Sequence, residues 1–241
     1  MNQSLIIIPT YNEKENILDI IQAVLDQGKH FNVLVVDDNS PDGTAQLVES
    51  LPSFGKSVFI LKRSGKYGLG TAYIAGFKYG LECGFDYIFE MDADFSHNPN
   101  DLPRLLTACL DGHDMSIGSR YVKGGNVENW PNDRLFLSKA ASLYVRMVTG
   151  MPIMDPTAGF ICYSRKVLDS LDLNKINFVG YTFQIAMKYY AFTKKFSIVE
   201  VPITFKDRTR GSSKMSSNII SEAIFGVLSM RKKQFMGYYN T

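Results

Sequence analysis

The chain has 241 residues, of which 45% are hydrophobic and 21% charged, so it is long enough to bury a substantial core. This composition excludes an intrinsically disordered, collagen-like, coiled-coil or disulfide-stapled protein. The formal net charge is only +2, from 26 Lys and Arg against 24 Asp and Glu, which gives no general attraction to nucleic acid. Any anionic partner must therefore be met by a local cluster of cations.

Cysteine spacing and hydropathy bear on where the protein works. Cys83, Cys109 and Cys162 lack the spacing of a metal site, and we interpret them as core thiols of a reducing compartment. No basic stretch precedes the first apolar run, which argues against a signal peptide. No run approaches the roughly 18–20 apolar residues of a membrane span. We expect a cytoplasmic protein that is soluble or bound peripherally to a membrane surface.

The first half of the chain alternates short apolar runs with helical stretches. Five β-branched runs predict strands: Leu5–Ile8, Val33–Val36, Val58–Leu61, Tyr87–Phe89 and Met115–Ile117. Apolar spacing predicts helices over Glu15–Leu25, Thr44–Leu51 and Thr71–Leu81. The strands start about 25 to 30 residues apart and are uninterrupted, as in βαβ units of a sheet buried on both faces. The prediction is an α/β fold with a doubly wound, mainly parallel sheet flanked by helices.

The second half is less regular. A Gly/Asn-rich loop, Lys123–Asn132, precedes a helix predicted over Leu135–Val148, and a Pro-punctuated stretch, Met151–Pro156, follows it. A strand–helix–strand region then ends in a strand over Ile198–Phe205. The segment Asn218–Phe235 predicts an amphipathic helix. Its apolar face carries Ile219, Ile220, Ala223, Ile224, Val227, Leu228 and Phe235, and its end carries Arg231, Lys232 and Lys233.

Polar residues follow four of the predicted strands where each strand ends. The first strand leads into Tyr11 and Glu13, the second into residues 37–44, the fourth into residues 92–94 and the fifth into Arg120. A single acidic turn usually caps a helix. In open α/β sheets, however, ligands bind beyond the carboxyl ends of the strands. Four polar ends at one edge therefore predict a ligand site there.

The triplet Asp92-Ala93-Asp94 is the most informative of these ends. Residues i and i+2 of an extended segment point the same way, so both carboxylates can face one point. Two close carboxylates repel unless a cation lies near them, and Mg²⁺ or Mn²⁺ completed by substrate phosphates meets that need. The alternative is an exposed acidic turn. His97 could approach such a metal, although a structural hydrogen bond is the commoner role of a loop histidine.

Six motifs together resemble the dolichol-phosphate mannose synthases, polyprenyl-phosphate sugar transferases among the inverting glycosyltransferases of family two. The motifs are Pro-Thr-Tyr-Asn-Glu (9–13), Val-Asp-Asp-Asn-Ser-Pro-Asp-Gly-Thr (36–44), Gly-Leu-Gly-Thr-Ala-Tyr (68–73), Met-Asp-Ala-Asp (91–94), Gly-Ser-Arg-Tyr (118–121) and Asp-Arg-Thr-Arg-Gly-Ser-Ser-Lys (207–214). The early motifs are shared by family-two transferases broadly, whereas 68–73 and 207–214 favour the polyprenyl-phosphate branch. The resemblance covers nearly the whole chain and implies a GT-A fold.

The resemblance also implies the residues of a nucleotide-sugar site. They are Pro9, Tyr11, Glu13, Val36, Asp38, Asp92, Ala93, Asp94, Arg120, Arg208 and Lys214. Asp92 and Asp94 would hold the Mg²⁺ or Mn²⁺ ion, with Ser96 at the position of a further ligand, where some relatives carry Gln. Arg120, Arg208 and Lys214 match residues that hold donor phosphates, and Asp92, Asp94 and Arg120 are the implied catalytic residues.

The implied activity is inverting transfer of mannose from GDP-mannose to a polyprenyl (dolichyl-type) monophosphate. Such an acceptor is already an anion, so no general base is required, and the cations of residues 206–214 suit a phosphate-gripping loop. Val36 and Asp38 suit guanine and uracil about equally, which leaves other donors such as UDP-glucose open. Another acceptor, or a non-catalytic nucleotide-sugar-binding subunit, are further alternatives. Clustered carboxylates argue against the last.

The expected organisation is one glycosyltransferase domain. Residues 1–120 form its nucleotide-sugar-binding half, 121–217 its acceptor side and basic loop, and 218–241 the amphipathic helix and tail. The expected partners are a nucleotide sugar, a polyprenyl phosphate, a membrane surface and a membrane-embedded partner subunit, because the chain matches the short type without C-terminal membrane helices. The basic end of the last helix predicts lipid contact, with simple packing on the domain as the alternative.

Overall fold

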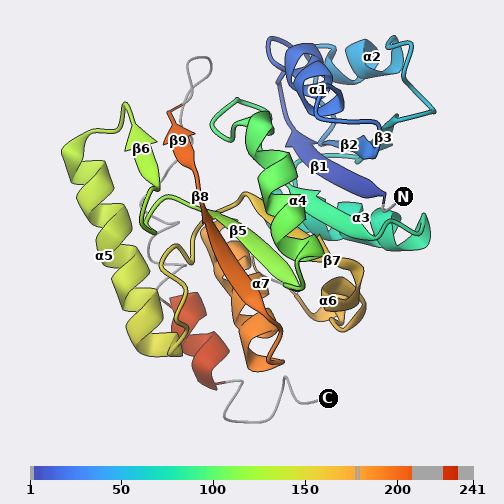
Figure 1. Ribbon diagram of the computed structural model, residues 1–241. Helices are drawn as coiled ribbons and strands as arrows, with labels where there is room; N and C mark the ends of the chain where they lie inside the picture. The colour runs from blue at the N-terminus through green and yellow to red at the C-terminus, as the bar shows by residue number, and fades with distance from the viewer. Residues whose placement is uncertain (1–2, 177, 179, 208–224, 233–241) are drawn as a thin grey trace.

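A computed structural model describes residues 3–176, 178, 180–207 and 225–232 of the chain. Its main sheet contains β1 (Ser4–Thr10), β2 (Phe31–Asp37), β3 (Val58–Lys62), β4 (Tyr87–Glu90), β5 (Met115–Ser119), β7 (Ile161–Ser164) and β8 (Ile198–Pro202). The order across the sheet is β3-β2-β1-β4-β7-β5-β8 (Figure 1). Neighbouring strands are parallel except at β7, which runs antiparallel to both β4 and β5. The predicted α/β class and mainly parallel sheet are confirmed.

Helices cover both faces of the sheet. One face carries α1 (Ile17–Leu25), α2 (Thr44–Glu49) and α4 (Leu102–Leu110), and the other carries α3 (Leu69–Glu82), α6 (Arg165–Asp169) and α7 (Gly180–Thr193). Successive side chains of β1 point to opposite faces of the sheet, and both faces are apolar. Leu5 and Ile7 lie in one core cluster, and Ile6 and Ile8 lie in the other. Two short 3₁₀ turns, η1 (Pro99–Asp101) and η2 (Leu173–Lys175), lie just before α4 and shortly after α6.

The second half departs from the sequence-based expectation in two places. The predicted loop Lys123–Asn132 contains a short strand, β6 (Asn126–Glu128). The single strand predicted over Ile198–Phe205 is instead two strands, β8 and β9 (Thr204–Lys206), which belong to different sheets. β8 pairs with β5 and β9 pairs with β6. The change of partner follows Pro202, which has no N–H to donate to a continuing ladder.

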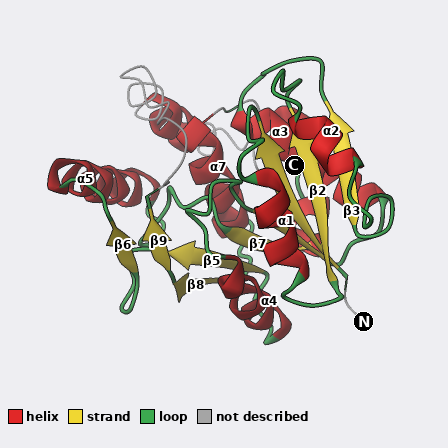
Figure 2. Cartoon of the chain, turned by 90° about the horizontal axis from the view of Figure 1, so that it is seen from above, coloured by secondary structure: helices red, strands yellow, loops and turns green. Residues whose placement is uncertain are grey.

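The longest helix stands apart from the two main layers. It is α5 (Asn132–Thr149), and Figure 1 shows it at the end of the molecule away from β1, β2 and β3, beside the β6–β9 ribbon. Figure 2 shows the same arrangement from above. The helix predicted over Leu135–Val148 is therefore confirmed, three residues longer at its start than predicted.

Only part of the predicted C-terminal helix lies in the described chain, where residues 225–232 are helical. Val227 and Met230 are buried in the same core cluster as Val145 of α5. Leu228, predicted on the same face as Val227, is 49% exposed instead, so the predicted apolar face does not hold at this position. Within the described residues, no helix has the length and apolar character needed to cross a membrane.

Two glycines let α3 lie close against the sheet. A Cβ at Gly76 would lie 2.7 Å from Ile7, and one at Gly80 would lie 2.7 Å from Ile88, so no larger residue fits without movement. The same helix carries Tyr73, whose fully buried side chain reaches the end of β4. Close packing in the core thus positions a hydroxyl at the predicted ligand site.

Candidate active site

The predicted polar strand ends meet at one edge of the sheet. β1, β2 and β4 are mutually parallel, and β5 shares their direction because β7 is antiparallel to both β4 and β5. Asp38, Asp92 and Arg120 follow the carboxyl ends of β2, β4 and β5. The crevice beyond such ends is where open α/β sheets bind ligands.

The end of β1 carries three of the predicted nucleotide-binding residues, Pro9, Tyr11 and Glu13, all partly exposed. The backbone N–H of Glu13 donates to Thr44 Oγ1 at 3.1 Å, which ties this turn to the loop after β2. Lys66 Nζ lies 4.9 Å from the centre of the Tyr11 ring, within cation–π range. The turn therefore presents an aromatic face and a cation at the same point.

At the end of β2, Asp38 forms an ion pair that the sequence did not reveal. Arg63 donates from Nε to Asp38 Oδ1 at 2.5 Å and from Nη2 to Oδ2 at 2.8 Å, and its Nη1 donates to Thr71 Oγ1 at 2.7 Å. The signal was available, because Arg63 directly follows β3, the neighbour of β2. Val36 lies differently, with its side chain wholly buried in the core, so a nucleotide can reach only its main chain.

The turn after β4 brings the two predicted metal-binding carboxylates to the edge. Tyr73 Oη lies 3.5 Å from Asp92 Oδ1, and the backbone N–H of Ser96 donates to Asp94 Oδ1 at 3.0 Å. Phe95 adopts a φ of 60°, the left-handed conformation that reverses the chain between Asp94 and Ser96. Both carboxylates are partly exposed, whereas Ala93 between them is buried.

His97 is a structural support for this turn. The backbone N–H of Asp92 donates to His97 Nδ1 at 3.1 Å, so that nitrogen acts as an acceptor and cannot also ligate a metal. The ring stacks on Phe160 with centres 4.9 Å apart. Burial lowers the pKa of His97 to about 4, so the imidazole is neutral near pH 7. Of the two roles considered for His97, the structure favours the hydrogen bond.

The donor set at this turn fits a divalent cation that a substrate completes. Among the described residues, no group of three or more His, Cys, Asp or Glu side chains is placed to hold a metal. Asp92 and Asp94 supply hard oxygen ligands, and Mg²⁺ is usually held by one or two carboxylates plus phosphates and water. Ser96 Oγ, also a hard oxygen, is buried with no hydrogen-bond partner in the described chain.

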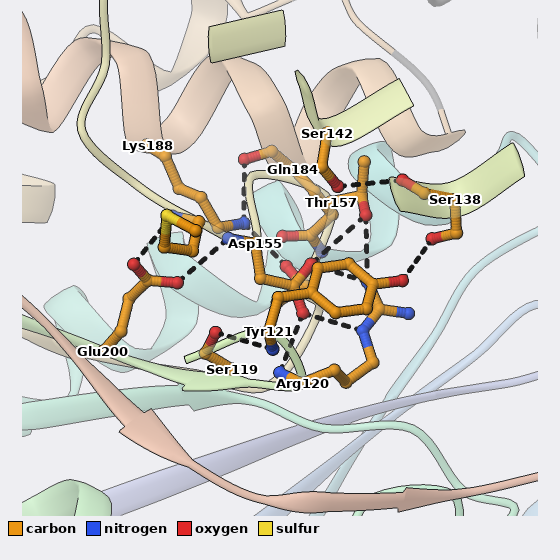
Figure 3. Close-up of polar contacts among 12 residues, drawn as sticks. Ser119, Arg120, Tyr121, Ser138, Ser142, Asp155, Thr157, Gln184, Lys188 and Glu200 are labelled. Carbon is orange, nitrogen blue, oxygen red and sulfur yellow. Dashed lines mark hydrogen bonds and ion pairs between the residues drawn. The ribbon is translucent and has the colours of Figure 1, made fainter. Parts of the chain in front are cut away.

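Arg120 lies in a buried ion pair with Asp155 (Figure 3). Its Nε donates to Asp155 Oδ2 at 2.7 Å, its Nη2 donates to Oδ1 at 2.6 Å, and its backbone N–H donates to Oδ2 at 3.0 Å. Burial alone would raise the pKa of Asp155, but the charge and hydrogen bonds of Arg120 outweigh it and hold that pKa below its usual value. The guanidinium also lies 5.4 Å from the Phe205 ring. Arg120 is therefore held rigidly at the edge.

The remaining predicted cations, Arg208 and Lys214, lie outside the described residues. The chain that leads to them leaves from the site, because the backbone N–H of Lys206 donates to Ser96 O at 3.4 Å. Asp207 accepts a hydrogen bond from Arg134 Nη1 at 2.9 Å. Residues 206 and 207 thus join the turn after β4 to the start of α5.

Comparison with known proteins agrees with this architecture. The family model described as "Glycosyl transferase family 2" matches residues 5–172. Polyprenol monophosphomannose synthase of Mycolicibacterium smegmatis is 49% identical over 226 residues, which are 93% of this chain and 85% of that protein. Undecaprenyl-phosphate mannosyltransferase of Micrococcus luteus is 47% identical over 223 residues, covering 92% of this chain and 91% of that protein.

A solved structure shows the same fold at low sequence identity. Glucosyl-3-phosphoglycerate synthase of Mycobacterium tuberculosis, in complex with Mn²⁺, UDP-glucose and phosphoglyceric acid, aligns with a TM-score of 0.71 at 18% identity. The alignment covers 96% of this chain and 80% of that one. The predicted GT-A fold and the resemblance that the motifs carried are confirmed, and this chain belongs to glycosyl transferase family 2.

Proposed function

We propose that the protein is a metal-dependent, inverting mannosyltransferase that moves mannose from GDP-mannose to a polyprenyl monophosphate. The observation that carries this proposal is 49% and 47% identity, over more than nine-tenths of the chain, to two proteins named for mannose and polyprenyl phosphate. The paired carboxylates at the sheet edge support it chemically. We propose the residues implied by the motifs as the donor site, within a single glycosyltransferase domain.

The proposed reaction needs charge stabilisation more than proton transfer. A phosphate oxygen of the acceptor attacks the anomeric carbon while the nucleoside diphosphate leaves from the opposite face. The acceptor is an anion, so the chain has no proton to remove, and its task is to hold two anions close together. Mg²⁺ or Mn²⁺ held by Asp92 and Asp94 would neutralise the charge that develops on the leaving diphosphate. Arg208 and Lys214 are proposed to bind the donor phosphates.

A panel of donors tests the donor and acceptor together. The purified protein would receive a short polyprenyl phosphate, Mg²⁺ and either radiolabelled GDP-mannose or radiolabelled UDP-glucose, the sugar nucleotide bound in the solved relative. We expect labelled lipid from GDP-mannose, none from UDP-glucose, and far less from GDP-mannose with the Asp94→Asn variant. Equal transfer from UDP-glucose would overturn the donor assignment. Donor consumption without labelled lipid would overturn the acceptor assignment.

A lipid acceptor requires contact with a membrane, and α5 has an exposed apolar stripe suited to it. Phe136, Leu143 and Met147 are 76%, 52% and 70% exposed, and their spacing places them on one side of the helix. Lys139 and Arg146 flank this stripe on one side. Apolar side chains bordered by cations are typical of helices that lie in the interface of an anionic bilayer.

The described part of the C-terminal helix also carries an exposed apolar side chain. Phe225 is 71% exposed, and the buried side of the same helix shares a core cluster with Val145 of α5. Figure 1 shows this helix near the C-terminal end of α5. We propose that both helices rest on the cytoplasmic face of a membrane, where a membrane-embedded partner subunit would adjoin them.

Replacing Phe136 and Met147 together by Ser should weaken binding to phosphatidylglycerol vesicles by about tenfold or more, since each buried apolar side chain contributes roughly 1.5–3 kcal/mol. Co-sedimentation with vesicles measures this. Leu110, which is 49% exposed on α4, provides the control, and Leu110→Ser should bind like the wild type. Equal binding of the double variant, or a wild-type dimer that the double variant disrupts, would contradict membrane contact through α5.

A further inference from the structure

A lysine lies fully buried beneath the edge of the sheet that carries the candidate site. Lys188, on α7, donates from Nζ to the carbonyl oxygen of Ala158 at 2.6 Å and to that of Gln184 at 3.1 Å (Figure 3). Burial lowers the pKa of its ammonium group to about 8, against the attraction of Glu90 and Asp155. An unpaired cation is rarely buried, because desolvation is unfavourable unless opposite charges and hydrogen bonds surround it.

On one side, Lys188 and its helix hold the end of β4. Glu90, the last residue of β4, is fully buried and accepts hydrogen bonds from Tyr163 Oη at 2.7 Å and from Gln184 Nε2. Gln184 in turn accepts from Lys188 through its backbone carbonyl. Two residues after Glu90 the chain reaches Asp92, so the start of the metal-binding turn is fixed from α7.

On the other side, Lys188 holds the loop between α5 and β7. Ala158, whose carbonyl accepts from Lys188, belongs to the same loop as Asp155, the partner of Arg120, and Phe160, on which His97 stacks. Because His97 accepts the Asp92 N–H, this loop contacts the metal-binding turn indirectly. Glu200 on β8 fixes the loop from outside by accepting the backbone N–H of Asp155 at 2.9 Å.

We propose that Lys188 is a positioning residue, which joins Glu90 and the loop of residues 154–160 so that the Asp92 turn and Arg120 keep their relative placement during transfer. The proposal deepens the proposed function and rests on it for the reaction concerned. Lys188 touches no reacting atom. Its effect passes through Glu90 on one route, and through Ala158, Phe160 and His97 on the other.

Lys188→Met tests the proposal, because Met keeps the length of the side chain but removes its charge and its hydrogen bonds. We expect kcat for mannosyl transfer to fall about tenfold or more with the KM for GDP-mannose within twofold, since misplacement affects the transition state more than ground-state binding. The matched control is Lys78→Met, at an exposed lysine that contacts Asn174 on the surface and should leave both constants unchanged.

A second readout does not depend on the reaction. In the metal-free protein, the amide resonance of Asp92 should shift in Lys188→Met and stay in place in Lys78→Met, because its acceptor His97 moves with the loop. If the wild type transfers no mannose, the proposed function fails. The comparison of Asp92 amide resonances between the two variants still tests the role of Lys188. A folded Lys188→Met variant with an unmoved Asp92 resonance and wild-type kcat would overturn the proposal.

A second variant distinguishes a loss of positioning from a loss of folding. Lys188→Met alone removes the buried cation that attracts the Glu90 carboxylate, whereas Glu90→Gln combined with Lys188→Met removes both charges. We expect the double variant to fold and still to show the lowered kcat, since the hydrogen bond to Ala158 is absent. A folded double variant with full kcat would also overturn the proposal.

Discussion

Asp94→Asn should lower the turnover number by about 10²-fold or more, the usual loss when a preorganised charge contact in an active site is removed. Asn keeps an oxygen for the N–H of Ser96, so the turn after β4 is retained and only the charge is lost. The substitution therefore separates the binding of a divalent cation from the shape of the turn. Steady-state rates with saturating GDP-mannose measure the effect.

Two further measurements accompany that variant. Asp111→Asn changes an exposed carboxylate just after α4 and should leave the rate unchanged. Excess EDTA should abolish activity of the wild type, and added Mg²⁺ or Mn²⁺ should restore it. Full activity in EDTA, or an Asp94→Asn variant that works at the wild-type rate, would contradict a metal at this turn.

Arg120→Met should lower the free energy of unfolding by about 3–5 kcal/mol, because it leaves the Asp155 carboxylate buried without its paired cation. Urea unfolding followed by circular dichroism measures this. Arg120→Met combined with Asp155→Leu should recover part of the loss, since neither charge of the pair is then left uncompensated, although Lys188 loses the attraction of Asp155. Each charge of the pair is thus tolerated in the protein interior only while the other is present.

An exposed ion pair provides the comparison. Lys62 and Glu49 pair at 2.6 Å with side chains 49% and 37% exposed, so Lys62→Met should change the free energy of unfolding by less than about 1 kcal/mol. If Arg120→Met is as mild as Lys62→Met, the guanidinium is not needed to compensate Asp155. Arg120 would then be available mainly for phosphate, as the motif implied.

The buried sheet was predictable because its strands carry a local signal. Uninterrupted apolar runs mark β1 to β5, and the polar residues that follow four of these strands mark the edge at which a ligand site is predicted. The position of Asp92 and Asp94 at this edge could be predicted because they directly follow the fourth apolar run, whereas their proposed role as metal ligands stays a prediction. β6 and β9 escaped prediction because each has three residues and is held by its pairing with the other, which no local pattern records.

The partners of the site residues were not predictable for the same reason. Arg120 and Asp155 are 35 residues apart, and Glu90 and Gln184 are 94 apart, so each contact depends on topology that the sequence does not display. Asp155 lies in a Pro-punctuated stretch that indicates an irregular loop and nothing more specific. Nothing in the sequence indicates that Lys188 is buried, because a lysine in a helix usually lies on the protein surface.

The antiparallel strand β7 has a consequence for the order in which the protein acquires its structure during synthesis. In the described chain, β5 pairs only with β7 and β8, so the sheet has no bridge from β4 to β5 until residue 164 has been made. A nascent chain of 120 residues can assemble β1 to β4 but leaves β5 without a neighbour. Residues 1–120, the predicted nucleotide-sugar-binding half, are thus not a separate folding unit, and the sheet edge beside β4 stays open to wrong pairing until β7 is in place.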